Sequence, residues 1–269
     1  MSRIADTFAS LRQRRQAGLV AYVTAGDPDL QRSADVLRAV DRGGADVIEV
    51  GVPFSDPLAD GPVIQRAAER ALRAGTTLSG VFDLVAGIRR DVRAPLVLFT
   101  YANPVVRLGF EAFADRAATA GVDGVLVLDL PLEEAGGLRT ALGDRGLDTI
   151  FLLSPTTTPE RIALAGQLGS GFLYVISRLG VTGTRDRLAD GVADLVGRVR
   201  AHASLPVALG FGLSRPEHVA AAGRIADAAV VGSALVQEVA RVADFPDLGA
   251  RVERFVGWLK GTAPAPEVS

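Results

Sequence analysis

The stretch VIEVGVPFSDPLADGPVIQRA, residues 47–67, holds one complete strand–loop–helix unit. Its apolar start predicts a strand over Val47–Gly51, and its Pro-, Gly- and Asp-rich centre predicts a loop. A helical period begins at Pro62, a residue type suited to the first position of a helix, and runs to Ala74. Because the same alternation recurs along the chain, we expect βαβ units and a parallel sheet.

Eight apolar runs of this kind are predicted strands: Leu19–Thr24, Val47–Gly51, Pro95–Tyr101, Val125–Asp129, Thr149–Leu153, Phe172–Ile176, Pro206–Leu209 and Ala228–Val231. Segments of helical period lie between them: Gln31–Asp41, Pro62–Ala74, Phe110–Ala120, Leu132–Leu142 and Gly191–His202. Eight such units in 269 residues is the count of a closed barrel. An open doubly wound sheet is the alternative, but it would usually need fewer strands, and no G-x-G-x-x-G follows the first strand.

We therefore predict an α/β fold, a single (β/α)8 TIM barrel over residues 1–269. The first residues, to about 14, read as an extra helix that caps the barrel floor. The Pro-rich tail over about residues 261–269 is expected to be frayed.

The composition argues against several classes of protein. A net charge of −2 gives no electrostatic case for binding nucleic acid or an anionic membrane. The absence of Cys removes disulfides, thiolate metal sites and cysteine nucleophiles. The polar N-terminal segment and the lack of a long apolar run predict neither a signal peptide nor a membrane helix, so we expect a cytoplasmic protein.

Lysine and histidine are scarce. The single lysine, Lys260, falls in the last helix and not on a strand, which argues against a Schiff-base mechanism. The two histidines, His202 and His218, fall before the seventh strand and in the helix after it. We expect them to be ordinary helix or surface residues, and we predict no metal site.

Carboxylates gather on the strand-to-helix side, which forms the active face of a barrel. Glu49 points into the barrel if Ile48 and Val50 face the helices, and burial would then raise its pKa toward that of a useful acid or base. The alternative is a glutamate satisfied by a neighbouring arginine or hydroxyl. Asp56 and Asp60 lie in the next loop, where turn formation or helix capping is the plainer explanation.

Aromatic residues and a third carboxylate mark the same face. Asp129 ends the predicted fourth strand, where a hydrogen-bonded structural aspartate is again the alternative. The only three tyrosines, Tyr22, Tyr101 and Tyr174, fall on predicted strands, and Phe99 shares the face of Tyr101. These rings could line an aromatic pocket, although aromatic residues also favour strands in general.

Glycines follow the last two strands. Gly210–Gly212 comes after the seventh strand, and Gly232 with Ser233 follows the eighth and opens a helix. Backbone N–H groups at such positions bind phosphate, and barrels often hold phosphate there. The loop LGVTGTR, residues 179–185, is either a lid over the site or a flexible surface loop.

These features leave metal-free acid–base catalysis on a phosphorylated small molecule that carries its own electron sink. The stretch DVIEVGVPFSDPLADGPVIQRA, residues 46–67, resembles the signature of the tryptophan synthase alpha chain family. Seven further motifs support the resemblance in family order between residues 22 and 236: YVTAGDPD, TYANPV, GVDGVLVLDLP, SPTTTPERI, SRLGVTG, LGFG and VVGSALV. The chain departs at Leu128, where many members have Pro, and beside the lid.

The resemblance implies a TIM barrel that cleaves indole-3-glycerol phosphate to indole and D-glyceraldehyde 3-phosphate. It implies that Glu49 moves protons at indole C3 and at the glycerol hydroxyl, that Asp60 takes or stabilises the indole N–H proton, and that Tyr174 orients Glu49. The residues matching phosphate-binding positions are Gly183, Gly212, Gly232 and Ser233, and those matching the indole pocket or its edge are Tyr22, Phe99, Tyr101 and Asp129.

The resemblance also implies an α2β2 complex with a beta chain that holds pyridoxal phosphate, while this chain has no cofactor of its own. The residues that would contact the beta chain or close the lid, and so connect the two sites, are Asp56, Pro57, Asn103 and Thr182. A stand-alone lyase, a phosphosugar isomerase and a non-catalytic activator of a beta chain are the alternatives. The retained Glu49 and Asp60 argue against the last two.

Overall fold

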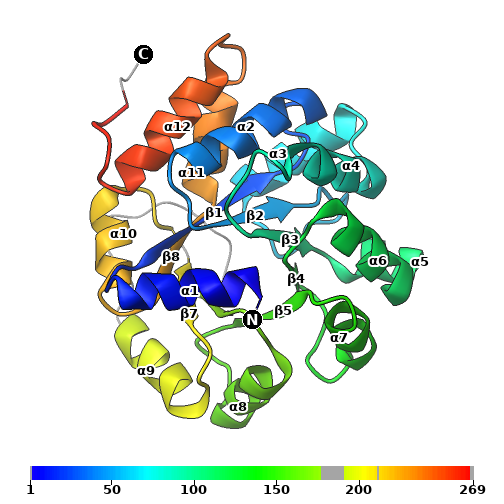
Figure 1. Cartoon of the computed structure of the whole chain (residues 1–269), viewed down its shortest axis with the longest axis vertical. Coiled ribbons are helices and arrows are strands. Elements are labelled where there is room, and N and C mark those ends of the chain that lie inside the picture. The colour runs from blue at the N-terminus through cyan, green and yellow to red at the C-terminus, as the bar shows by residue number, and fades with distance from the viewer. Residues whose placement is uncertain (1, 177–190, 211, 267–269) are drawn as a thin grey trace.

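Eight parallel strands close into a barrel in chain order, with β8 paired to β1 (Figure 1). The computed structural model describes residues 2–176, 191–210 and 212–266. The strands are β1 (Gly18–Thr24), β2 (Val47–Gly51), β3 (Leu96–Thr100), β4 (Gly124–Val127), β5 (Asp148–Leu153), β6 (Leu173–Ile176), β7 (Val207–Gly210) and β8 (Ala228–Val231). The predicted TIM barrel and all eight predicted strands are thus confirmed, with ends that differ by up to two residues.

Helices surround the barrel, and one of them, α1, lies across its end (Figure 1). They are α1 (Arg3–Gln13), α2 (Leu30–Arg42), α3 (Pro62–Arg73), α4 (Leu78–Ile88), α5 (Ala102–Leu108), α6 (Phe110–Ala120), α7 (Gly136–Gly143), α8 (Pro159–Leu168), α9 (Val192–His202), α10 (Pro216–Gly223), α11 (Ser233–Val242) and α12 (Leu248–Leu259). Within the described ranges, no helix is both long and apolar enough to cross a membrane.

Two predicted boundaries are wrong for local reasons. The fourth strand was expected to end at Asp129, but β4 ends at Val127 because the chain turns there. The carboxylate of Asp129 accepts a hydrogen bond from the backbone N–H of Ala102 at 2.6 Å and so holds this turn against the start of α5. The helix predicted from Leu132 begins only at Gly136, because the residues before it form turns.

Side chains alternate between the barrel interior and the helix layer. Val47 belongs to the interior cluster, whereas Ile48 and Val50 pack in the layer between strands and helices. Since neighbours on a strand point to opposite faces, Glu49 points into the barrel, as the sequence pattern predicted. The register sets Glu49 beside Tyr22 of β1 and Val97 of β3.

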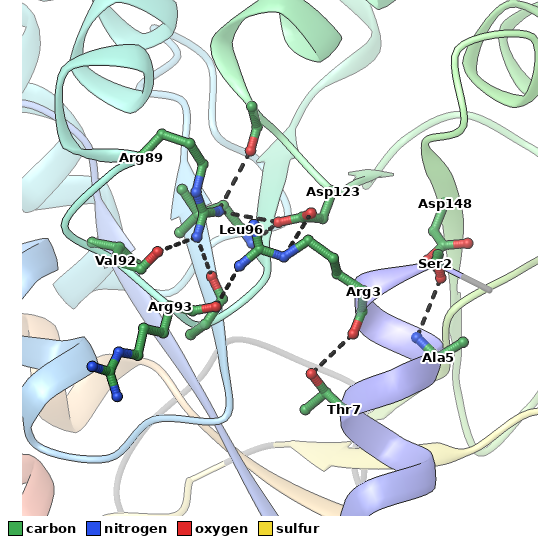
Figure 2. A network of polar contacts seen from close by, with 12 residues as sticks. Ser2, Arg3, Ala5, Thr7, Arg89, Val92, Arg93, Leu96, Asp123 and Asp148 are labelled. Atoms are coloured by element: carbon green, nitrogen blue, oxygen red, sulfur yellow. Dashed lines mark hydrogen bonds and ion pairs between the residues drawn. The ribbon is translucent and has the colours of Figure 1, made fainter.

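The helix α1 closes the N-terminal end of the barrel. It presents Ile4, Phe8 and Leu11, all buried, to the interior cluster. A polar network surrounds this end, where the Asp123 carboxylate lies between Arg3 and Arg89 and accepts a hydrogen bond from the backbone N–H of Leu96 at 2.8 Å (Figure 2). These charged groups lie at the end of the barrel opposite the strand-to-helix loops. We therefore interpret the network as one that stabilises the fold and not as part of a functional site.

Candidate active site

Glu49 is a fully buried carboxyl group near the mouth of the barrel. Its side chain is 0% exposed, and neither carboxyl oxygen has a hydrogen-bond partner among the described residues. Burial without a partner penalises the charged form and raises the pKa of Glu49 to about 8. At neutral pH the group is therefore a protonated acid that can donate a proton into the mouth. The alternative of a glutamate paired with an arginine is wrong for the described part of the chain.

The burial of Glu49 also lowers the free energy of unfolding at neutral pH. The folded pKa of Glu49 lies above that of an unfolded glutamate, so folding is favoured at low pH and loses stability as pH rises toward 8. The neutral variant Glu49→Gln lacks this loss. We therefore expect the difference in free energy of unfolding between Glu49→Gln and the wild type to change by about 4 kcal/mol in favour of the variant between pH 4 and pH 7.5.

Denaturant unfolding at several pH values measures this difference. Glu238→Gln serves as the control, because Glu238 is also a buried glutamate but is paired with Arg241 at 2.8 Å. If the difference in free energy of unfolding between Glu49→Gln and the wild type does not change with pH, then Glu49 ionises in the folded protein as readily as in the unfolded chain.

Asp60 is the second carboxylate at the mouth and lies in the loop between β2 and α3. It is 8% exposed, and its Oδ2 accepts a hydrogen bond from the Tyr101 hydroxyl at 3.0 Å. Burial raises the pKa of Asp60 to about 6, and the Tyr101 hydrogen bond opposes that rise. The helix-capping alternative is wrong here, because Gly61 is the N-cap of α3 and no side chain caps that helix.

The two carboxyl groups thus differ in protonation at neutral pH. Burial raises both pKa values, but Glu49 is the more deeply buried of the two, and only Asp60 has a hydroxyl donor that stabilises its charge. Glu49 therefore remains an acid while Asp60 is ionised. Two titratable groups whose surroundings separate their pKa values are the usual sign of an acid and a base in one site.

Aromatic rings line the space beside Glu49. Phe99 contacts Tyr22 with ring centroids 5.2 Å apart and Tyr174 with centroids 6.4 Å apart. Burial is the main cause that raises the pKa of Tyr22 and of Tyr174, and a charged Glu49 would raise both further, so these hydroxyls stay neutral near it. Tyr101 lies apart from this group: it begins the connection to α5 and its ring contacts Phe54 at 5.1 Å.

Two glycines make room for the tyrosine hydroxyls. A Cβ on Gly51 would lie 2.1 Å from the Tyr22 hydroxyl, and one on Gly210 would lie 2.6 Å from that of Tyr174. Gly51 had no role in the sequence analysis beyond its place in the strand. Its position at the end of β2, two residues after Glu49, is the signal that could have drawn attention to it.

Three of the four predicted phosphate-binding residues, Gly212, Gly232 and Ser233, follow the paired strands β7 and β8. Gly212 follows β7 with a φ of +74°, a conformation that favours glycine. Gly232 is the N-cap of α11, and Ser233 begins that helix directly after β8, so the N-terminus of α11 lies at the end of this strand. A helix N-terminus at such a place favours the binding of an anion. Thr182 and Gly183 of the predicted lid lie outside the described residues.

Three predicted partner-facing residues are described: Asp56 and Pro57 in the loop after β2, and Asn103 in the helix α5 after β3. Asp56 is exposed and accepts a hydrogen bond from the Ser55 hydroxyl at 2.7 Å, and Asn103 is exposed on α5. Two exposed apolar residues, Leu58 at 90% and Val106 at 58%, lie on the same two segments. Sequence reasoning missed both, although an apolar residue between Pro57 and Ala59 in a polar loop was a usable signal.

The remaining polar candidates have structural explanations. Lys260 donates to Asp46 and to the carbonyl of Gly44, both at 2.7 Å, just before β2 and away from the mouth. His202 is exposed at the end of α9. His218 lies within the helix α10, as expected, but is buried: it is 7% exposed, and its Nδ1 accepts from the backbone N–H of Ser214 at 3.3 Å. No group of three metal-binding side chains occurs within the described residues.

The chain is similar to known proteins over most of its length. A family model described as "Tryptophan synthase alpha chain" matches residues 8–260. The tryptophan synthase alpha chain of Solibacter usitatus is 48% identical over 260 residues, which cover 97% of each chain.

Solved structures give the same result. A chain of Mycobacterium tuberculosis tryptophan synthase is 38% identical, covers 97% of this chain and 98% of its own, and has a TM-score of 0.87. A chain of the tryptophan synthase complex from Pyrococcus furiosus is 37% identical, covers 91% and 98%, and has a TM-score of 0.84. Both barrels are therefore similar to this one over nearly their whole length.

Proposed function

The chain belongs to the tryptophan synthase alpha chain family, and from this premise we propose how Glu49 and Asp60 share its reaction. The alpha chain is a lyase that cleaves indole-3-glycerol phosphate to indole and D-glyceraldehyde 3-phosphate in a retro-aldol step. The observation that carries the proposal is the difference between the two carboxyl groups, with Glu49 a buried unpartnered acid and Asp60 a stabilised carboxylate.

The reaction begins with proton transfer from the Glu49 carboxylic acid to C3 of the indole ring. The ring becomes an iminium ion, and the Asp60 carboxylate stabilises its positively charged N–H. The Glu49 carboxylate then takes the proton of the glycerol hydroxyl, the C–C bond breaks, and its electrons return to the indole ring. The hydroxyl carbon leaves as the aldehyde of glyceraldehyde 3-phosphate, and Glu49 ends as the acid it was at the start.

Substrate binding would use the groups around the carboxylates. The rings of Tyr22 and Phe99 line the indole side, and Tyr174 would hold the Glu49 carboxyl group in position once substrate is bound. Tyr101 fixes the side chain of Asp60. The phosphate would bind at Gly212, Gly232 and Ser233, with Gly183 of the lid as the further member. Asp129 would flank the site and not bind the indole, because its carboxylate already accepts a hydrogen bond from the backbone N–H of Ala102.

The proposed partner is a tryptophan synthase beta chain in an α2β2 complex, which receives the indole. The exposed loop around Asp56, Pro57 and Leu58 and the helix α5 with Asn103 form the partner-facing surface, and Thr182 of the lid would couple to Asp56. Pyridoxal phosphate would belong to that partner. The residues of this chain do not fit it, because Lys260 is the only lysine and its ammonium group is bound by Asp46. We also propose a cytoplasmic location. The substrate carries a charged phosphate and does not cross a bilayer unaided, so the enzyme must be in the compartment where the substrate is made.

Indole release from indole-3-glycerol phosphate, by the purified chain with and without an added beta chain, tests the function. We expect slow release by the chain alone and a large stimulation by the beta chain, because partner contacts bear on the loop that carries Asp60. Fast release without the partner would favour a stand-alone lyase. No release under either condition would overturn the lyase assignment and favour an activator or a phosphosugar isomerase.

A further inference from the structure

Gln65 connects the helix α3 to two points of the loop that carries Asp60. Its side-chain amide donates to the carbonyl oxygen of Asp60 at 2.9 Å and to that of Pro57 at 3.3 Å. Its backbone N–H donates to the Gly61 carbonyl at 2.9 Å, within the first turn of the helix. One half-buried side chain therefore binds both ends of the segment 57–60.

That segment joins the interior of the site to the surface. At its end, Asp60 is buried and bonded to Tyr101, whereas Leu58 in the middle of the segment is 90% exposed. The backbone N–H of Asp60 also donates to the Pro57 carbonyl at 3.0 Å, which makes the segment a tight turn. The Pro57 carbonyl, one residue before Leu58, is thus held by both the Gln65 side chain and the backbone N–H of Asp60.

The helix that carries Gln65 is itself anchored. Arg70, on the same helix, makes two hydrogen bonds of 2.8 Å with the carboxylate of Asp27 in the loop after β1. Asp27 is 3% exposed, so this ion pair is largely shielded from solvent on the carboxylate side. Gln65 thus projects from a helix fixed to a neighbouring loop of the barrel mouth.

We propose that Gln65 is a positioning residue that transmits contacts made by a partner at Leu58 to the backbone of Asp60. This inference rests on the proposed function, since it assumes that Asp60 takes part in the reaction and that a beta chain binds the exposed loop. Gln65 touches no reacting atom. It acts by fixing the Asp60 carbonyl relative to Pro57, so that movement of the surface turn and movement of the catalytic carboxylate occur together.

The test compares Gln65→Met and Gln65→Glu with the wild type. Methionine keeps the length of the side chain and removes both donors, and glutamate places carboxylate oxygens against two carbonyl oxygens. We expect the rate of indole release by the chain alone to fall about 10- to 100-fold, as for a misplaced catalytic group. We also expect the ratio of the rates with and without the beta chain to fall toward 1, while binding of the beta chain changes less than about 2-fold.

The stimulation ratio distinguishes positioning from a folding defect. A beta chain binds and stabilises the folded chain, so a lower fraction of folded protein would leave the ratio unchanged or raise it, whereas loss of positioning lowers it. Gln31→Met is the matched control, since Gln31 is exposed on α2, and it should leave both rates unchanged. Wild-type stimulation in both Gln65 variants would overturn the inference while leaving the proposed function intact. A wild type that releases no indole would instead overturn the proposed function, and one that releases indole without stimulation would overturn the coupling.

Discussion

Glu49→Gln is expected to lower the rate of indole release by about 10²- to 10⁴-fold, the usual contribution of a positioned acid or base. The amide has nearly the shape of the protonated carboxyl group that burial favours at this position. It can neither give a proton to indole C3 nor take one from the glycerol hydroxyl. The barrel and its binding groups remain, so substrate binding and association with a beta chain should change little.

The measurement is single-turnover indole formation with saturating substrate, together with the affinity for the beta chain. Glu238→Gln provides the control for removing a buried carboxylate elsewhere in the barrel, and it should retain wild-type rates. Rapid turnover by Glu49→Gln would remove Glu49 from the mechanism. Equal losses in both variants would point to a folding defect.

The same residue shows which parts of the site the sequence could predict. A glutamate between Val47 and Gly51 on an alternating strand must point inward if Ile48 and Val50 face the helices, and the structure confirms that orientation. This prediction depended only on the period of a strand. The eight strands were predicted for the same reason, because short apolar runs separated by helical segments are a strong pattern.

Contacts between loops could not be predicted in this way. Tyr101 was expected on a strand, but β3 ends at Thr100. The Tyr101 hydroxyl donates to Asp60 and accepts from the backbone N–H of Ala59. No periodicity encodes that contact, because it depends on how two loops of different strands meet. The role of Gln65 was missed for the same reason, since a glutamine near a helix start has no sequence signal that separates it from a solvated one.

Sequence reasoning also cannot assign a protonation state, which depends on burial and on partners. Both Glu49 and Asp60 were candidate acids or bases in the sequence. Only the structure separates them, because Tyr101 donates to Asp60 whereas Glu49 has no partner among the described residues. This difference leads to a prediction about pH that the sequence alone does not support.

Asp60→Asn is expected to lower kcat/KM at pH 7.5 by about 10²-fold, because a neutral amide cannot stabilise the iminium charge as a carboxylate does. For the wild type, kcat/KM should rise as Asp60 ionises near pH 6 and fall as Glu49 loses its proton near pH 8. In Asp60→Asn the rise near pH 6 should disappear and the fall near pH 8 should remain.

Tyr101→Phe sharpens this test, because its hydroxyl is the group that lowers the pKa of Asp60. Without that hydrogen bond the pKa of Asp60 should increase, and the acidic side of the profile should move to higher pH while the basic side stays in place. A phosphate monoester on the substrate also titrates near pH 6, so the wild-type profile alone cannot assign this side. If the rise near pH 6 persists in Asp60→Asn and does not move in Tyr101→Phe, it belongs to the substrate, and Asp60 is not the group whose ionisation controls the reaction.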